Sequence, residues 1–342
     1  MALRLSVLDQ SPIAEGGSGA QALRNSVDLA RLTESLGYSR YWVAEHHGMP
    51  MLASAAPEIL IAEIAAVTER IRVGSGGVML PHYSPFKVAE TFSILGGLHG
   101  DRIDLGIGRA PGSDRETMFA LQRDRRQMSP DDFPEQLTEL LAYVENDFPA
   151  DHPFARLATL PGAPGRPDVW LLGSSPQSAI WAGQLGLPYS VADFINPGGA
   201  ANARLYRERF EPRRREQPEV TVCVAAICAD SKEETERLAS STRMAITLLR
   251  RGQLIAVPSV EKALAFFDQP GESVAAGSRR VVVGTPETVR SGLEAVAEEY
   301  GADEVLVVTI THDHEARKRS YELLAEAFGL EAAYSSPLEL EQ

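Results

Sequence analysis

The sequence predicts an α/β fold, a closed (β/α)8 barrel of the TIM type. Short apolar, β-branched segments alternate strictly with amphipathic segments along the chain, which favours one parallel sheet with helices outside it. Eight such strand-then-helix units can be counted, and eight units favour closure into a barrel over an open sheet. The 342 residues, 44% of them hydrophobic, provide enough apolar material for a large core.

The first four units follow one another with a single interruption. Strands are predicted at 3–8, 39–44, 71–79 and 103–107, and their helices at 22–36, 57–68, 85–98 and 133–144. β-branched apolar runs predict the strands, and apolar residues at helical spacing predict the helices. Gly37 follows the first helix, where glycine is a favoured C-terminal cap. A polar segment at 112–130 separates the fourth strand from its helix.

The last four units contain a long insertion. Strands are predicted at 169–172, 189–194, 220–228 and 304–310, and helices at 176–185, 201–210, 232–249 and 315–328. About fifty residues between the seventh helix and the eighth strand include a strand-like run at 281–283 and a helix at 286–300. Segment 250–280 is predicted to be a lid, with an exposed spacer as the alternative. One domain is expected over 1–331, followed by a tail at 332–342.

Composition argues against several classes of function. The formal net charge is −14 and no basic run is present, so no nucleic-acid partner is expected. No uncharged apolar run approaches the roughly 20 residues that span a bilayer, and the N-terminus lacks the layout of a signal peptide. A cytoplasmic protein without a membrane partner is therefore expected. Cys223 and Cys228 share one predicted strand, so both are predicted to be buried thiols.

The second predicted strand ends in Glu45-His46-His47. In barrels of this kind the chemistry lies at the C-terminal ends of the strands. Adjacent residues of an extended segment point to opposite faces, so one histidine would face the barrel opening and the other would pack behind it. A histidine there can donate or accept a proton near neutral pH. The alternative is one core histidine and one surface histidine.

Glycines cluster at the next two strand ends. Gly74-Ser75-Gly76-Gly77 lies within the third strand, where glycines indicate a bulge, a tight packing point or a ligand close to the backbone. The fourth strand ends in Gly106-Ile107-Gly108-Arg109. A nicotinamide-binding fingerprint is rejected because Pro111 occupies its third glycine position. Arg109 can instead hold a phosphate or a carboxylate.

A serine-rich turn joins the fifth strand to its helix. Ser174 or Ser175 can cap that helix, with Pro176 in its first turn. The free N–H groups and the dipole of a helix N-terminus favour an anion. Ser175, Ser178 and Arg109 together form a plausible monophosphate cradle, and a simple N-cap is the alternative reading of the turn.

The segment His312-Asp313-His314 follows the eighth strand. Two histidines at this spacing can bind a metal, and His82 could add a ligand. No convincing set of carboxylates accompanies them, so capping of the last helix by Asp313 is preferred and no metal is predicted.

Several segments then match one known family in the right order over nearly the whole chain. They are 42–47, 73–81, 86–90, 102–109 and 174–178, with Trp181 and Gly186-Leu187-Pro188. Together they closely resemble the bacterial luciferase-like flavin monooxygenases of the FMN type. The resemblance implies a (β/α)8 barrel with an insertion near the seventh strand. It also implies reduced FMN, delivered by a separate NAD(P)H-dependent flavin reductase, and O2 that oxygenates a small organic substrate.

The resemblance assigns roles to individual residues. His46 matches the catalytic histidine, with Glu45 beside it, and Gly76 matches the site of a non-prolyl cis peptide against the flavin ring. The residues predicted to bind the cofactor are Ser75, Gly76, Gly108, Arg109, Ser174, Ser175 and Ser178. A homodimer is expected, as is common among related proteins. Two alternatives stay open: an F420-dependent oxidoreductase on the same fold, and a flavin-binding protein without turnover.

The chain departs from luciferase at several positions. Gly108 stands at the position of luciferase's reactive cysteine, and Ser174 at that of its phosphate-side glutamate. A second phosphate-binding arginine has no clear counterpart, with Arg125 and Arg126 as candidates. Bioluminescence is therefore not expected.

Overall fold

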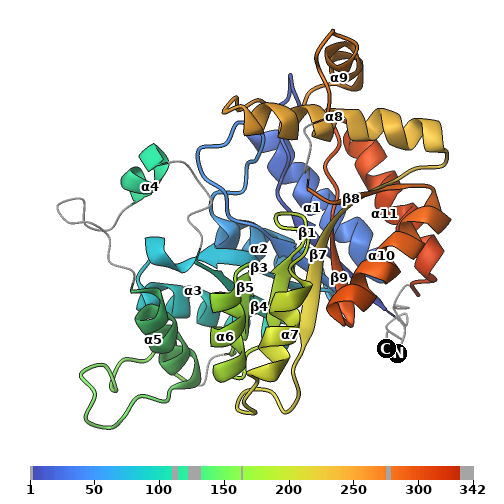
Figure 1. Cartoon of the computed structure of the whole chain (residues 1–342). Coiled ribbons are helices and arrows are strands. Elements are labelled where there is room, and N and C mark those ends of the chain that lie inside the picture. The colour runs from blue at the N-terminus through green and yellow to red at the C-terminus, as the bar shows by residue number, and fades with distance from the viewer. Residues whose placement is uncertain (1–2, 110–114, 122–131, 163–164, 275–278, 332–342) are drawn as a thin grey trace, which may run out of the picture.

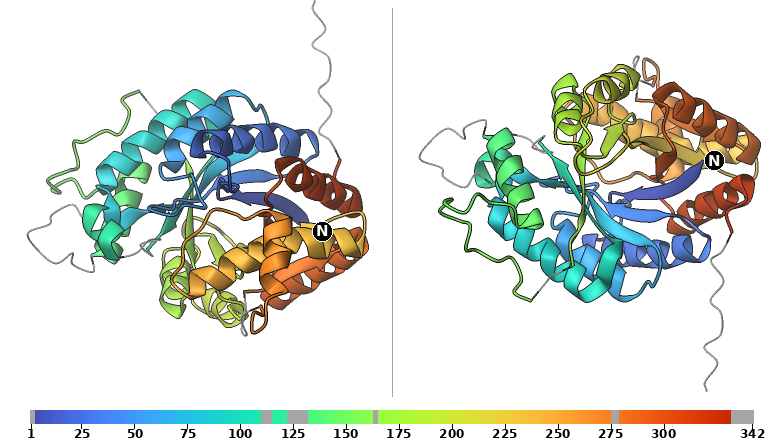
Figure 2. Two further views of the ribbon diagram at one scale, coloured as in Figure 1. Left: turned by 90° about the horizontal axis from the view of Figure 1, so that it is seen from above. Right: turned by 90° about the horizontal axis from the view of Figure 1, so that it is seen from below.

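The computed structural model describes residues 3–109, 115–121, 132–162, 165–274 and 279–331. Eight parallel strands close a barrel with helices outside it (Figure 1), which confirms the predicted fold class. The strands are β1 (Arg4–Asp9), β2 (Arg40–Val43), β3 (Arg72–Met79), β4 (Ile103–Gly108), β5 (Asp168–Gly173), β6 (Tyr189–Ala192), β7 (Val220–Cys228), β8 (Val281–Gly284) and β9 (Glu304–Val308). Seen from above and below, the helices surround the strands (Figure 2).

The helices follow the strands as the alternation predicts. They are α1 (Gly19–Ser35), α2 (Pro57–Ala66), α3 (Pro85–His99), α4 (Arg115–Leu121), α5 (Phe133–Glu145), α6 (Pro176–Gln184), α7 (Ala200–Glu208), α8 (Lys232–Arg250), α9 (Val260–Phe267), α10 (Pro286–Tyr300) and α11 (His314–Phe328). Short 3-10 turns cover Leu80–His82 and Gly100–Arg102. In the described part of the chain, no helix is long and apolar enough to cross a membrane.

The ninth strand comes from the long insertion. The barrel closes because β7 pairs with both β6 and β9, and β9 pairs with β1. β8 lies outside this ring and, among the described residues, pairs only with the C-terminal half of β7, Ala225 to Cys228. β7 can pair with β6 and then with β8 along one edge, opposite the edge that pairs with β9, because it is nine residues long. The predicted eighth barrel strand is therefore β9, and the strand-like run at 281–283 is β8.

The structure differs from the predicted elements at several points, and α1, for example, begins at Gly19 and α2 ends at Ala66. Helix α4 lies inside the segment that was expected to be only a polar excursion. Strand β6 ends at Ala192 and β9 at Val308, each two residues earlier than predicted. After β6 the backbone turns, with the Asp193 amide donating to the Val191 carbonyl at 3.2 Å, so the next residues leave the ladder.

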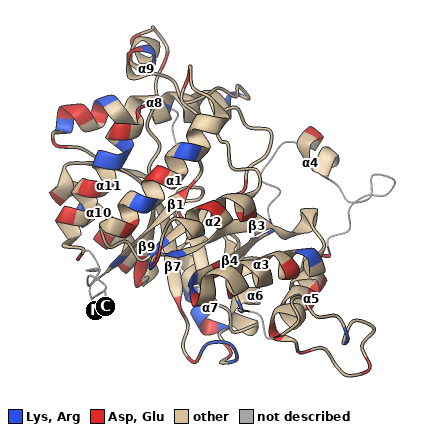
Figure 3. Cartoon of the chain, turned by 180° about the vertical axis from the view of Figure 1, so that it is seen from behind, with Lys and Arg blue, Asp and Glu red and all other residues tan. Residues whose placement is uncertain are grey.

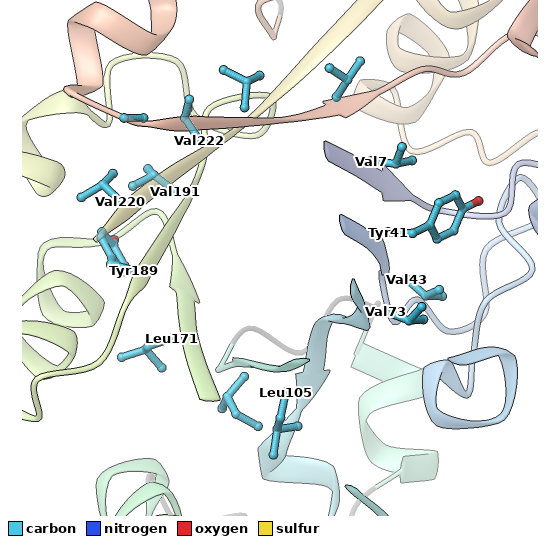
Figure 4. Close-up of a cluster of buried hydrophobic side chains, with 14 of the residues drawn as sticks. Val7, Tyr41, Val43, Val73, Leu105, Leu171, Tyr189, Val191, Val220 and Val222 are labelled. Atoms are coloured by element: carbon cyan, nitrogen blue, oxygen red, sulfur yellow. The ribbon is translucent and has the colours of Figure 1, made fainter. Parts of the chain in front are cut away.

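Side chains alternate between the two faces of the barrel wall. Tyr41 and Val43 belong to the shell between strands and helices, whereas Trp42 points inward and meets Trp170 with ring centroids 5.4 Å apart. Figure 4 shows strand residues of the outer shell, namely Val7, Tyr41, Val43, Val73, Leu105, Leu171, Tyr189, Val191, Val220 and Val222. Charged side chains of both signs lie on the outer helices (Figure 3).

A buried ionic network lies inside the barrel near the N-terminal ends of the strands. Arg40 donates from Nε to Glu304 Oε1 at 2.6 Å and from Nη1 to Asp104 Oδ2 at 2.9 Å. The indole Nε1 of Trp42 donates to the same Asp104 oxygen at 2.8 Å. The network occupies the base of the barrel and leaves the opposite, C-terminal end for a ligand.

Candidate active site

The C-terminal ends of the strands surround a cavity of about 490 Å³. We call it the serine cavity, after the turn between β5 and α6 that forms one wall. Eight of the nine predicted site residues line it, which are Glu45, His46, Gly76, Gly108, Arg109, Ser174, Ser175 and Ser178. The topology thus brings together residues from the ends of β2, β3, β4 and β5.

Ser75 is the one predicted site residue that does not line the serine cavity. Its side chain is fully buried, and its Oγ donates to the Gly106 carbonyl at 2.9 Å. This contact ties β3 to β4. The structure therefore places Ser75 in the barrel wall, behind the glycines that do reach the cavity.

Gly76 and Gly77 form a bare backbone wall of the serine cavity. The peptide bond between them is cis, as the family resemblance implied for Gly76. A Cβ atom at Gly77 would lie 2.6 Å from the Gly106 carbonyl oxygen, and one at Gly76 would overlap Leu8 and lie 3.1 Å from Trp42 Cβ. Neither position has room for a side chain, so a ligand there meets backbone alone.

The N-terminus of α6 opens toward the same cavity. Ser175 caps the helix, and its Oγ accepts from the Ser178 amide at 3.3 Å. Ser178 Oγ donates to the Ser175 carbonyl at 2.7 Å and lies 3.0 Å from the Tyr189 hydroxyl. The capping prediction is confirmed, and the helix directs its N-terminal dipole toward a cavity that also contains Arg109.

Arg109 completes the cationic side of the cavity. Its guanidinium carbon lies 5.6 Å from the centre of the Trp181 ring, within the range of a cation–π contact. Both residues line the serine cavity. Arg125 and Arg126, the candidates for a second arginine, lie outside the described residues.

The two adjacent histidines have different surroundings, as the extended segment predicts. His47 Nε2 lies 2.6 Å from Glu45 Oε1. Glu45 also accepts from the Tyr83 hydroxyl and from the Met79 amide, each at 2.9 Å. Its carboxylate is thus occupied by contacts that fix the strand ends.

His46 faces the cavity instead. Its Nδ1 is buried and has no hydrogen-bond partner in the described structure. Burial, with the positive charge of Arg279 second, lowers the pKa of His46 to about 4. The imidazole is therefore neutral at physiological pH, with a ring nitrogen left for a ligand.

A second cavity, of about 390 Å³, adjoins the first. We call it the apolar cavity because most of its wall is aliphatic, including Met49, Met51, Leu52, Ile246, Leu249, Leu254 and Ile310. Four residues line both cavities: Gln10, His46, Phe194 and Ile195. His46 therefore lies at the junction between a polar, glycine-walled cavity and an apolar one.

Comparison with known proteins is consistent with this arrangement. The family model described as "Luciferase-like monooxygenase" matches residues 3–304. The chain belongs to that family. A luciferase-like monooxygenase of Escherichia coli K12 is 44% identical over 94% of this chain and 96% of its own. The crystal structure of apo-MsnO8 is 42% identical, with a TM-score of 0.89 over 97% of this chain and 99% of that one.

A more distant structure shows the same fold. The oxygenating constituent of 3,6-diketocamphane monooxygenase from Pseudomonas putida, solved in complex with FMN, is 20% identical to this luciferase-like chain. Its TM-score is 0.71 over 96% of this chain and 98% of that one.

The remaining sequence motifs lie apart from both cavities or serve the fold. Asp313 caps α11 by accepting from the Ala316 amide at 2.7 Å, as predicted. His314 Nε2 lies 3.0 Å from Asp28, and His312 Nε2 lies 3.2 Å from the Glu15 carbonyl. Among the described residues, no three His, Cys, Asp or Glu side chains could hold a metal ion together.

Both cysteines are free and buried, which confirms their prediction. Burial raises the pKa of each thiol to about 12. Cys223 lines the serine cavity, but as a neutral thiol.

The sequence analysis did not predict several residues that line the two cavities. Gln10 follows the end of β1, and the rule that singled out Glu45 and His46, a polar residue just after a strand, would have found it. Phe194 and Ile195 carry no such signal, because they reach the cavities only when the chain leaves β6. Arg279 and Leu254 come from the segment predicted to be a lid and line the apolar cavity. The closing movement of that segment stays a prediction.

Proposed function

We propose that this luciferase-like monooxygenase binds reduced FMN in the serine cavity and uses O2 to oxygenate a small organic molecule in the apolar cavity. The observation that carries the proposal is the junction at His46, where a glycine-walled cavity with a helix N-terminus meets an apolar one. A flavin mononucleotide has a flat ring and a phosphate, and the residues present fit both. The bound, reduced flavin would supply the electrons that activate O2.

The chain's own residues would bind the cofactor at two ends. The N-terminus of α6, with Ser175, Ser178 and Arg109, would hold the phosphate through N–H donors, hydroxyls and positive charge. Gly76 and Gly77, which have no room for a side chain, would let the ring lie against the backbone. The aliphatic wall of the adjoining cavity would keep water away from the reacting atoms.

His46 would move or hold a proton at the junction. Its imidazole is neutral, because burial lowers its pKa to about 4, so it can accept a proton or a hydrogen bond at physiological pH. Glu45 would be a positioning residue. Its hydrogen bonds to His47, Tyr83 and the Met79 amide would hold the strand end that carries His46 in place.

Three properties of the working enzyme belong to the same proposal. A separate NAD(P)H-dependent flavin reductase would deliver the reduced cofactor. The chain would act as a homodimer, and it would act in the cytoplasm. Size-exclusion chromatography with light scattering tests the dimer, and NADH-driven turnover with and without an added reductase tests the supply of cofactor.

The deciding experiment is an anaerobic titration of the apoprotein with reduced FMN, oxidised FMN and F420, followed by exposure to O2. We expect reduced FMN to bind most tightly, and its reoxidation rate to change when it is bound. Tight binding of F420 with no binding of FMN would instead assign the chain to hydride transfer. FMN binding with no organic substrate oxygenated in a broad screen would point to a flavin-binding protein without turnover.

A further inference from the structure

Arg279 is turned into the apolar cavity, whereas its neighbour Arg280 is turned out. Arg279 and Val281 both line that cavity. Arg280, between them, places Nη1 2.7 Å from Glu299 and Nε 3.6 Å from Asp193. The alternation of an extended segment explains the difference, since residues two apart share a face. One of two adjacent arginines is therefore directed at the cavity by the register of β8.

Arg279 has no acidic partner in the described part of the chain. Its guanidinium forms no hydrogen bond or ion pair among the described residues. The positive charge of Arg250 acts on Arg279, and the charge of Arg279 in turn acts on His46. Burial and the positive charge of Arg250 lower the pKa of Arg279. A partly buried guanidinium without a counter-charge is disfavoured, so an anion that enters this cavity would supply the counter-charge that the fold does not.

The rest of the apolar cavity offers few competing polar groups. Thr242 lines it, but its Oγ1 donates to the Ile310 carbonyl at 2.6 Å. Gln10 and His46 lie at the junction with the serine cavity, and most of the other lining residues are aliphatic. The cationic groups predicted for the cofactor phosphate, Arg109 and the α6 N-terminus, belong to the other cavity. Arg279 is thus a cationic group of the apolar cavity, separate from the cationic groups of the serine cavity.

We propose that Arg279 binds the carboxylate of an otherwise apolar substrate and so determines which molecules the apolar cavity accepts. The planar guanidinium matches a carboxylate through two parallel hydrogen bonds. The aliphatic wall buries the body of the molecule, and its far end reaches His46 at the junction. The substrate class is a small monocarboxylate with an apolar chain. The assignment of this molecule as a substrate rests on the proposed function, whereas its binding does not.

The test is calorimetric titration of the apoprotein with matched probes. Octanoate and octanamide have the same chain and differ in charge, and octane-1-sulfonate carries a tetrahedral anion. We expect octanoate to bind at least tenfold more tightly than octanamide, and more tightly than the sulfonate. Equal affinities for octanoate and octanamide, no binding of any probe, or preference for the sulfonate would each overturn the proposal.

Variants assign the effect to one side chain. R279M should abolish the preference for octanoate over octanamide, and R279K, which keeps the charge but not the planar fork, should retain part of it. R280M removes the same charge from the neighbouring residue and should behave like the unmodified chain. An octanoate preference that survives in R279M, or that disappears equally in R280M, would contradict the role of Arg279.

Reduced-FMN affinity, measured on the same variants, separates the two proposals. Arg279 does not line the serine cavity, so R279M should bind reduced FMN as the unmodified chain does. A chain that selects octanoate but does not bind reduced FMN would refute the proposed function and leave the carboxylate site intact. A chain that binds reduced FMN but does not distinguish octanoate from octanamide would refute the carboxylate site and leave the proposed function intact.

Discussion

Glu45 Oε1 lies 2.6 Å from His47 Nε2, so the buried acid at the end of β2 is paired with the histidine that faces away from the cavity junction. His46, one residue earlier, keeps a buried Nδ1 without a protein partner. His47 therefore pairs with Glu45 and supports the strand end, whereas His46 keeps a ring nitrogen available to a ligand.

Replacement of His46 by alanine should abolish most turnover while reduced FMN still binds. General acid–base groups contribute about 100-fold to 10,000-fold to a rate, so we expect kcat to fall by about that range. Steady-state kinetics and a flavin titration on the same preparation check both parts. His47→Gln, which alters the Glu45 pair but not the cavity nitrogen, should cost less. Normal turnover in His46→Ala would refute the role.

The neutral state of His46 should make stability depend on pH in a defined window. Its pKa is about 4 in the folded chain, against 6.5 for the free side chain. Between these values the unfolded chain binds more protons at this group, so stability rises with pH. The contribution is therefore fully present above pH 6.5 and is lost as the pH falls toward 4.

Urea denaturation of the unmodified chain and of His46→Gln checks this dependence. The free energy of unfolding of the unmodified chain, relative to the variant, should decrease from pH 7.5 to pH 4.5. A constant difference across that range would contradict the lowered pKa.

Gly77→Ala should disrupt the wall of the serine cavity. The added Cβ would lie 2.6 Å from the Gly106 carbonyl oxygen, a backbone atom that cannot rotate away. Overpacking of this kind costs about 1–3 kcal/mol, and the displaced wall should weaken flavin binding. Gly19→Ala is the matched control, because its Cβ would lie at an ordinary 3.8 Å from the Ala53 and Ile13 side chains and Gly19 lines neither cavity. Thermal melts and flavin titrations should separate the two variants, and equal effects would argue against the backbone clash.

Arg109→Ala should weaken FMN binding more than riboflavin binding, because riboflavin lacks the phosphate. Hydrogen bonds to charged groups contribute about 1.5–3 kcal/mol, which corresponds to a loss of about tenfold or more. Fluorescence titrations with both flavins measure the difference. Equal losses for the two ligands would remove Arg109 from the phosphate site.

Glu304→Ala should destabilise the fold strongly without touching either cavity. It leaves the Arg40 guanidinium, 2.6 Å from Glu304 in the intact barrel, with only part of its counter-charge. Removal of one partner of a buried pair costs about 3–5 kcal/mol. Glu294→Ala breaks the exposed pair with Arg290 at 2.9 Å and should cost about 0.5 kcal/mol or less. Chemical denaturation compares the variants, and similar losses would contradict the buried role.

Local patterns were sufficient for most of the fold. β-branched runs and helical spacing depend on neighbours in the chain, so they located the eight barrel strands, the helix after each, and the cap by Asp313. The strand-end rule placed Glu45, His46, Gly76, Gly108, Arg109, Ser174, Ser175 and Ser178 at one end of the barrel, where they line one cavity.

Tertiary structure decided what each of these side chains meets. The sequence could not distinguish Ser75, whose hydroxyl donates to the Gly106 carbonyl of the next strand, from Ser178, which reaches the cavity. It could not tell which of His46 and His47 would pair with Glu45, or that Arg279 would enter an apolar cavity while Arg280 paired with Glu299. Such outcomes depend on the register between strands far apart in the chain. The sequence alone therefore determined the barrel and the end that carries its site, whereas long-range packing assigned the individual contacts.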